Sequence, residues 1–327
     1  MSIQEELNIL KGDLSHIHIM VIGDVMIDRY IVGTANRISP EAPVPVILWK
    51  RTDDKLGGAA NVAANLKAMG CTVSIMGLCG NDADAVILEK LVEDIGCDHV
   101  HLLYDTSRPT TVKTRIVAEL HQIARIDHEI DDEINADLQK KGLLILTEIF
   151  TQNKIDVLIL QDYNKGFLHT GWIHKIIELA VEHRIKIAVD PKKLHFFDYR
   201  GVDLFKPNLK EAAQILNFNS NEASNLALLS KTLKDKLLCK KLMITLASEG
   251  IWIASDQVHQ QFLTRPRKVA DVSGAGDTVI SLAAICMACS LSDVFMANCC
   301  NVGGGQVCEK FGVVPVNKEE LIQELLD

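Results

Sequence analysis

The sequence lacks a hydrophobic run long enough to cross a membrane. No apolar stretch among its 327 residues approaches the roughly 20 residues that a spanning helix needs. The first ten residues carry Glu5 and Glu6 and lack the basic segment and apolar core of a secretory signal. We therefore expect a cytoplasmic protein without a membrane span.

Basic residues are in the minority. The chain has 34 Lys and Arg against 43 Asp and Glu, which gives a net charge of -9. Because binding to a nucleic-acid backbone requires a basic face, this balance argues against nucleic acid as a partner. A local basic pocket for a phosphorylated small molecule is still compatible with it.

Metal-ligand spacings are scarce. Cys286 and Cys289 have the C-x-x-C spacing, but they lie in apolar, helix-like sequence without a nearby histidine, where cysteine behaves as a small core residue. The eleven histidines form neither H-E-x-x-H nor H-x-G-H. We expect the nine cysteines to be reduced thiols, and we expect neither a metal site at this pair nor a nucleotidyltransferase activity.

Two common nucleotide-binding fingerprints are also missing. The chain contains no G-x-x-x-x-G-K-[ST] loop and no G-x-G-x-x-G after a strand. A P-loop enzyme and a nicotinamide-dependent dehydrogenase are therefore both disfavoured.

An alternation of strand and helix patterns runs through the sequence. It predicts one α/β domain over residues 1–327 with a mostly parallel sheet flanked by helices. The expected strands are 18–23, 73–77, 157–160, 187–189, 203–206 and 241–245, and the expected helices are 60–69, 83–96, 172–183, 209–216 and 279–287.

Four shorter strand patterns depart from this alternation. Residues 30–33 and 44–51 flank a proline-rich turn, and residues 111–118 and 121–128 flank a turn near Glu119 and Leu120. We interpret them as a small antiparallel lid, within about 29–51 and 109–128, that projects from the main domain. One face would cover a substrate and the other would meet a second subunit.

The segment 271–278, Asp-Val-Ser-Gly-Ala-Gly-Asp-Thr, carries the most chemistry. The small residues Gly274, Ala275 and Gly276 let backbone N–H groups converge on one anion where the apolar helix 279–287 begins. Asp277 would lie in the first turn beside this cradle, able to take a proton from a hydroxyl. The alternative is an acidic residue that merely favours the helix start.

Two other segments have a functional and a structural interpretation. Gly57 and Gly58 precede a helix that carries Asn61, so a sugar could approach the backbone there, although such a turn is common before helices. Asn208 with Glu211 three residues later is a capping box when seen alone.

Taken together, the double-glycine segment 57–61 and the segment 271–277 resemble the ribokinase-like, or PfkB-type, carbohydrate kinases. Segments 23–30, 37–46, 57–63, 162–166 and 190–192 resemble most closely the branch that phosphorylates D-glycero-D-manno-heptose 7-phosphate at its anomeric hydroxyl in bacterial heptose biosynthesis. This resemblance implies a kinase that uses ATP and Mg²⁺, with a monovalent cation left open, and a role in ADP-heptose, lipopolysaccharide or surface-glycan precursor synthesis. It also implies a homodimer through the lid. Since the chain ends at Asp327 without H-x-G-H, we expect a form without the nucleotidyltransferase of bifunctional relatives.

The resemblance assigns roles to individual residues. Asp277 becomes the base, and Gly274, Ala275 and Gly276 become the anion hole. The sugar would be bound by Asp24, Asp28, Gly58 and Asn61. The nucleotide and magnesium would lie near Asn208, Glu211, Thr245, Gly250, Asn301 and Gly305, with Glu211 reaching Mg²⁺ through water. The family commonly has glycine where this chain has Ala247.

The phosphate of such a substrate requires cations. The candidates are Arg37, Arg125, Lys165 and Lys192, each of which is otherwise an ordinary solvated residue. A kinase for another sugar or sugar phosphate, and a non-catalytic sugar or nucleotide sensor on the same fold, remain alternatives.

Overall fold

The computed structural model describes residues 1–119, 121–219 and 225–326, in which nine strands form one large sheet. Neighbouring strands pair in parallel from one edge as far as β11, and the last two strands at the other edge run antiparallel. In spatial order the strands are β5 (His99–Tyr104), β4 (Thr72–Cys79), β1 (His18–Gly23), β8 (Val157–Gln161), β9 (Lys186–Asp190), β10 (Leu204–Phe205), β11 (Lys241–Thr245), β12 (Ile251–Ala254) and β13 (His259–Phe262).

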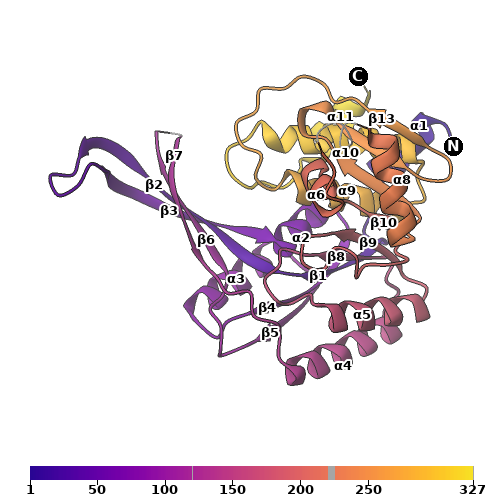
Figure 1. The fold of residues 1–327 in the computed structure, drawn as a ribbon, viewed down its shortest axis with the longest axis horizontal. Helices are drawn as coiled ribbons and strands as arrows, with labels where there is room; N and C mark the ends of the chain where they lie inside the picture. The colour runs from indigo at the N-terminus through magenta and orange to yellow at the C-terminus, as the bar shows by residue number, and fades with distance from the viewer. Residues whose placement is uncertain (120, 220–224, 327) are drawn as a thin grey trace.

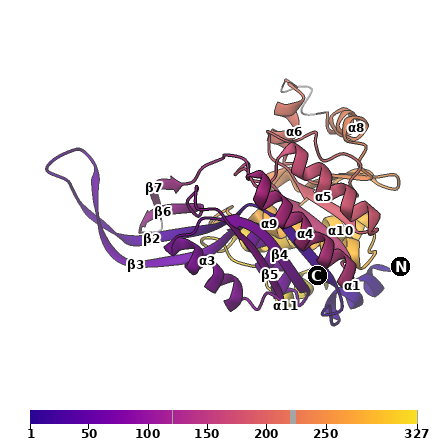
Figure 2. The ribbon, with the colours of Figure 1, turned by 90° about the horizontal axis from the view of Figure 1, so that it is seen from below.

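Helices cover both faces of this sheet, as Figures 1 and 2 show. In β1, Ile19 and Val21 pack into one core and Met20 and Ile22 into the other, because successive side chains of a strand point to opposite faces. The first core is closed by α1 (Ile3–Lys11), α2 (Ala59–Ala68), α3 (Ala83–Asp94), α9 (Ala275–Ala288), α10 (Asp293–Cys308) and α11 (Lys318–Leu326). The second is closed by α4 (Ala136–Gln152), α5 (Thr170–Glu182), α6 (Leu209–Ile215) and α8 (Leu226–Leu237).

The lid is a second sheet that extends away from the body of the molecule (Figure 1). It consists of β3 (Pro45–Gly58), β2 (Val25–Ile38), β6 (Val112–Ala118) and β7 (His121–His128), in that order. The pairs β2–β3 and β6–β7 are antiparallel as expected, but they join through a parallel pairing of β2 with β6. This central pairing was not indicated by the sequence, because it connects segments about 80 residues apart and no local turn specifies it.

The predicted α/β architecture is confirmed. The strands predicted at 18–23, 121–128 and 241–245 have the predicted bounds. The lid strands β2 and β3 are longer than predicted: β2 begins two residues after β1 of the main sheet, and β3 ends where α2 begins. Leu120, at the predicted lid turn, lies outside the described residues. Within the described part of the chain, no helix has the length and apolar character to cross a membrane, and the nine cysteines are unbridged.

Candidate active site

The carboxyl ends of several parallel strands bring polar side chains to one edge of the sheet. Gln161 ends β8, Asp190 ends β9 and Lys206 follows β10, and all three side chains are buried. Asp277 reaches the same place from the first turn of α9. The strand-helix alternation thus assembles a polar cluster within an otherwise apolar interior.

Asp277 is the most enclosed carboxylate of this cluster, at 3% exposure. Its oxygens accept hydrogen bonds from Asn61 Nδ2 at 2.7 Å, Tyr163 Oη at 2.8 Å and Gln161 Nε2 at 3.0 Å. Burial raises its pKa to about 7, although the bonds from Asn61 and Tyr163 oppose the shift. A carboxyl group with this pKa is suited to accept a proton near neutral pH.

The loop before Asp277 has the backbone geometry of an anion cradle. Gly274 is the N-cap of α9 with φ of 81°, in the left-handed region that favours glycine. The first N–H groups of a helix have no partner within the helix and can therefore bind an anion. Of the three residues predicted to form the cradle, Ala275 already uses its N–H, which donates to the carbonyl oxygen of Val272 at 3.3 Å. A side chain at Gly276 would lie 3.7 Å from both Asp190 Oδ2 and Lys206 Nζ, so the space in front of Gly276 faces that ion pair.

Lys206 and Asp190 form an ion pair that the sequence did not single out. Their Nζ–Oδ2 distance is 3.0 Å, and both side chains are almost completely buried. Gln161 Nε2 connects the pair to Asp277, because it donates to Asp190 Oδ2 at 3.2 Å and to Asp277 Oδ1 at 3.0 Å. Gln161 Oε1 has no partner among the described residues. The positions of Gln161 and Lys206 at the ends of expected strands were the available signal.

Two residues that were predicted to bind the sugar, Asn61 and Asp24, are hydrogen-bonded to other protein groups. Asn61 donates to Asp277 and its Oδ1 accepts from Asn65 Nδ2 at 3.3 Å. Asp24 Oδ2 accepts from the backbone N–H groups of Tyr163 at 2.7 Å and Lys165 at 3.1 Å. In this structure Asn61 therefore positions Asp277, and Asp24 holds the loop that places Tyr163 against Asp277.

Asp28, Gly57 and Gly58 lie together in a second polar region, where the lid meets the main sheet. Asp28 is buried and paired with Arg115, and burial raises its pKa despite that guanidinium. A side chain at Gly57 would lie 2.5 Å from Asp28 Oδ2, and one at Gly58 would lie 2.3 Å from the carbonyl oxygen of Asp24. These close approaches explain the double glycine, and Gly58 also has φ of 57°.

The predicted magnesium and phosphate residues lie together. Asn208 and Glu211 form the capping box of α6. Asn208 also forms an isolated parallel β-bridge with Thr245, and Glu211 Oε1 lies 2.6 Å from Lys192 Nζ. Burial lowers the pKa of Lys192, but the negative charges of Asp190 and Glu211 and the hydrogen bond to Glu211 have the larger effect. The pKa of Lys192 is therefore raised. The capping and the ligand interpretations of Glu211 are compatible, since one carboxylate oxygen caps the helix and the other meets the lysine.

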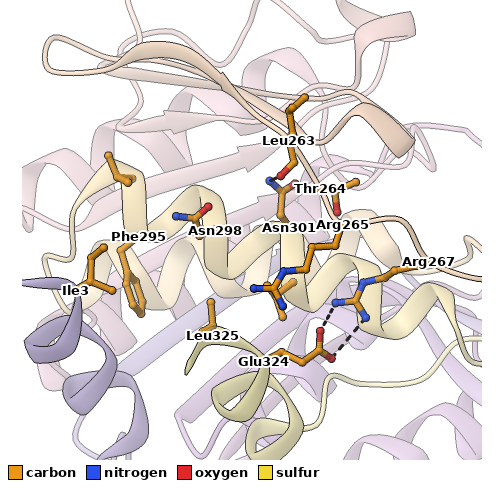
Figure 3. Close-up of a pocket in the computed structure, with 12 residues that line it drawn as sticks. Ile3, Leu263, Thr264, Arg265, Arg267, Phe295, Asn298, Asn301, Glu324 and Leu325 are labelled. Carbon is orange, nitrogen blue, oxygen red and sulfur yellow. Dashed lines mark hydrogen bonds and ion pairs between the residues drawn. The ribbon is translucent and has the colours of Figure 1, made fainter. Parts of the chain in front are cut away.

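Asn301, one of the two residues expected near the nucleotide base, borders a cavity of about 280 Å³ beside α10 (Figure 3). Asn301 lines it and donates to Phe262 O at 2.9 Å, and Arg265 and Phe295 complete its walls. Gly305 is covered by Arg267, whose Nε would lie 2.4 Å from a side chain there and whose guanidinium pairs with Glu324.

The loop expected beneath the nucleotide has its own backbone requirements. Gly250 has φ of 93° and faces the carbonyl oxygen of Phe262, so packing alone demands a glycine. Ala247 begins the short 3₁₀ helix η1 (Ala247–Glu249) with φ of 53°. This left-handed conformation is the physical reason why glycine suits that position.

Three of the four predicted phosphate cations are paired with carboxylates, and Arg125 and Lys165 belong to one ion-pair network through Asp127, Lys113 and Glu129. Arg37 is exposed near the end of β2, and Arg125 is half exposed on β7, where it pairs with Asp127 at 2.8 Å. Lys165 pairs with Glu129 at 2.6 Å, and Lys192 pairs with Glu211 at 2.6 Å.

Comparisons with known proteins show which family and which fold the chain shares. A family model described as pfkB family carbohydrate kinase matches residues 16–319. Bifunctional protein HldE of Methylobacillus flagellatus is 38% identical over 307 residues, which cover 94% of this chain and 63% of that protein. Bifunctional protein HldE of Helicobacter pylori is 37% identical over 303 residues, with 93% and 65% covered. The chain spans less than two thirds of the length of these relatives.

Solved structures share the fold at low sequence identity. Phosphofructokinase-2 from Escherichia coli in complex with potassium has a TM-score of 0.78 at 16% identity, covering 95% of this chain and 99% of that one. Arabidopsis thaliana ribokinase complexed with ribose and ATP has a TM-score of 0.71 at 17% identity, covering 94% and 98%.

Proposed function

The chain belongs to the pfkB family of carbohydrate kinases, and from this premise we propose that it phosphorylates the anomeric hydroxyl of D-glycero-D-manno-heptose 7-phosphate with ATP. The product would be a heptose 1,7-bisphosphate, a precursor of ADP-heptose for lipopolysaccharide or another surface glycan. The heptose assignment is supported by the similarity to the HldE proteins and by segments 23–30, 37–46 and 162–166.

The position of Asp277 carries the proposal. Its carboxylate lies beside the glycine loop at the start of α9, and three side-chain donors hold it in place. In the proposed reaction Asp277 accepts the proton of the anomeric hydroxyl while that oxygen attacks the γ-phosphorus and the bond to the leaving ADP oxygen breaks.

Charge on the moving phosphoryl group would be stabilised by the loop and by Lys206. The N–H groups of Gly274 and Gly276 favour an anion at the helix start, and the space before Gly276 opens toward the buried lysine. Pre-positioned donors of this kind supply most of the catalysis in phosphoryl transfer, because the reaction needs little covalent help from the protein.

Magnesium fits the carboxylate beside this space. Mg²⁺ is usually held by one or two carboxylates together with water and substrate phosphates, so the lack of any cluster of three metal-binding side chains in the described residues does not conflict with it. Glu211 would hold the ion through water, with Asn208 and Lys192 nearby. The bound ion would neutralise charge on the phosphates. Potassium in the phosphofructokinase-2 complex makes K⁺ the monovalent ion to test.

The nucleotide would extend from this space over Thr245 and Gly250 toward Asn301 and Gly305. The cavity beside Asn301 supports a base-binding site there. Since Arg267 covers Gly305, its guanidinium would have to move aside or stack on the base when ATP binds.

The lid supports a homodimer. Its strands expose large apolar side chains on a sheet that extends from the body, which is unusual for a surface that faces only water. They are Ile38, Val44, Leu48, Trp49, Ile123 and Ile126. Light scattering on Trp49→Asp and Ile126→Asp variants should report monomers, and dimers in both variants would reject the lid as the interface.

The function is tested by measuring ATP consumption with heptose 7-phosphate, fructose 6-phosphate and ribose. We expect turnover with heptose 7-phosphate alone, and a kcat lower by about 10²- to 10⁴-fold in Asp277→Asn with ATP binding retained. Turnover of another sugar would keep the kinase and reject the heptose assignment. ATP binding without turnover of any of these sugars would favour a sensor.

A further inference from the structure

Lys55 is a half-buried cation without a counter-ion at the base of the lid. Among the residues that the structure describes, no carboxylate lies within ion-pair distance of its Nζ, which lies over the ring of Tyr30 at 5.6 Å from the centroid. Burial lowers the pKa of Lys55, and more distant carboxylates, including Asp28, compensate only in part. Such an ammonium group gains more than a solvated one from an anion that arrives as a ligand.

Arg115 lies near the same aromatic ring, with its guanidinium carbon 5.4 Å from the centroid of Tyr30. Its Nη1 donates to Asp28 and to the carbonyl oxygen of Lys113, while Nε and Nη2 have no partner among the described residues. The guanidinium therefore keeps unused donors in a region where its side chain is only 11% exposed.

The strand register places these groups on one face of the lid. Lys55 on β3 is the cross-strand partner of Asp28 on β2, and Arg115 on β6 is the partner of Tyr30. Asp28 and Tyr30 are two positions apart, so their side chains and those of their partners point to the same face.

This face of the lid is turned toward the glycine loop that precedes Asp277. Tyr30 Oη accepts from the N–H of Val313 at 3.2 Å, and a Val313 methyl group lies 3.3 Å from the position of a side chain at Gly274. A side chain at Gly312 would lie 3.2 Å from Lys55 Nζ. Lys55 and Arg115 are therefore held within one packed region together with the start of the anion loop.

Two other lysines near the lid base are already neutralised. Lys113 meets Glu129 at 2.7 Å and Asp127 at 3.3 Å, and Lys165 shares Glu129. A second anion would have to compete with these carboxylates, whereas Lys55 has none to displace.

We infer that Lys55 and Arg115 bind the phosphate group that the sugar substrate already carries. The forked guanidinium suits two phosphate oxygens, and the lysine adds a point charge next to it. As the phosphate engages Arg115, Asp28 is released to accept a hydrogen bond from a sugar hydroxyl. This inference rests on the proposed function, because only a phosphorylated sugar needs the pair.

The test compares steady-state kinetics of the native chain, Lys55→Met and Arg115→Lys. Lys50→Met is the matched control, since Lys50 is an exposed lysine on the same strand. We expect the KM for heptose 7-phosphate to rise about 10- to 100-fold in Lys55→Met, as for loss of a charge-assisted contact, with the KM for ATP within about 2-fold. Arg115→Lys keeps a charge beside Asp28 and so protects folding, but it should raise the same KM. Inorganic phosphate should inhibit the native chain competitively and Lys55→Met much less.

The outcomes separate the two proposals. If the native chain turns over ribose or another unphosphorylated sugar in preference, the proposed function fails and the inference fails with it. If it prefers heptose 7-phosphate but Lys55→Met behaves like Lys50→Met, the function stands and the inference is wrong. Arg37→Gln and Arg125→Gln are then the next variants, and a selective rise of KM in either would place the phosphate farther out on the lid.

Discussion

Asn61 Nδ2 lies 2.7 Å from Asp277 Oδ2, although 216 positions separate the two residues in the chain. The contact joins α2, which follows lid strand β3, to α9, which carries Asp277, and both side chains are buried. It is short because α2 and α9 pack side by side, with Asn65 accepting from Thr278 Oγ1 at 2.9 Å one turn further on. The protonation of Asp277 is thereby coupled to the packing of two distant segments.

The pH dependence of activity should report this coupling. Because Asp277 must be deprotonated to act as a base and its pKa is raised to about 7, kcat/KM of the native chain should fall about tenfold per pH unit below that value. Asn61→Ala removes a bond that stabilises the carboxylate, so the acid limb should move up by about 1 pH unit. Tyr163→Phe should act in the same direction. An unmoved acid limb in both variants would contradict the role of these two bonds in stabilising the carboxylate.

The stability of the fold should also depend on pH through buried carboxyl groups. Burial raises the pKa of Asp277 and of Asp24 to about 7, from 3.8 in water. A carboxyl group whose pKa is higher in the folded than in the unfolded protein contributes its full stabilisation when the pH is below the unfolded-state pKa. This stabilisation is lost as the pH rises through the folded-state pKa. The Tm of the native chain should therefore fall by several degrees between pH 5 and 8, and Asp277→Asn should reduce that fall. Equal slopes in calorimetry would refute the assignment for Asp277.

The Lys206–Asp190 pair should be costly to break on one side. Lys206→Met leaves Asp190 buried without its partner and should destabilise the protein by about 3–5 kcal/mol. The double variant Lys206→Met with Asp190→Asn should recover most of that loss in chemical denaturation. If Lys206 stabilises the moving phosphoryl group, the stable double variant should still have a strongly reduced kcat. Recovery of kcat together with stability would limit Lys206 to a structural role.

Two glycines of the anion loop should respond differently to alanine. At Gly274 the new methyl group would lie 2.7 Å from Asn61 Nδ2 at φ of 81°, so Gly274→Ala should destabilise by about 1–2 kcal/mol and disturb the base. At Gly276 the methyl group would make ordinary 3.7 Å contacts, so Gly276→Ala should keep its Tm. It should nevertheless lower kcat, because the methyl group occupies the space in front of Lys206. Native kinetics in Gly276→Ala would place the phosphoryl group elsewhere.

Local patterns in the sequence predicted much of this protein. Strand-helix alternation predicted the layered α/β architecture, since hydrophobic periodicity is a local property of the chain. The apolar run predicted a helix over 279–287 with Asp277 in its first turn. The structure begins this helix earlier, at Ala275, directly after Gly274 with φ of 81°. The alternating patterns of 111–118 and 121–128 likewise predicted the β6–β7 hairpin almost to the residue.

Only the tertiary structure decided which polar groups meet. Nothing local to Gln161, Tyr163 or Lys206 indicates that they lie in one polar cluster with Asp277. They stand at the ends of β8 and β10, which meet the start of α9 only through the parallel order of the sheet. In the same way, the need of a phosphate for cations led to Arg37, Arg125, Lys165 and Lys192 as candidates, whereas the cross-strand register of β2, β3 and β6 put Lys55 and Arg115 beside Asp28. The sequence by itself determined the layers and the loop that can hold an anion. The pairing of distant strands determined which charges face that loop and which are neutralised, because register and burial depend on contacts between segments far apart in the chain.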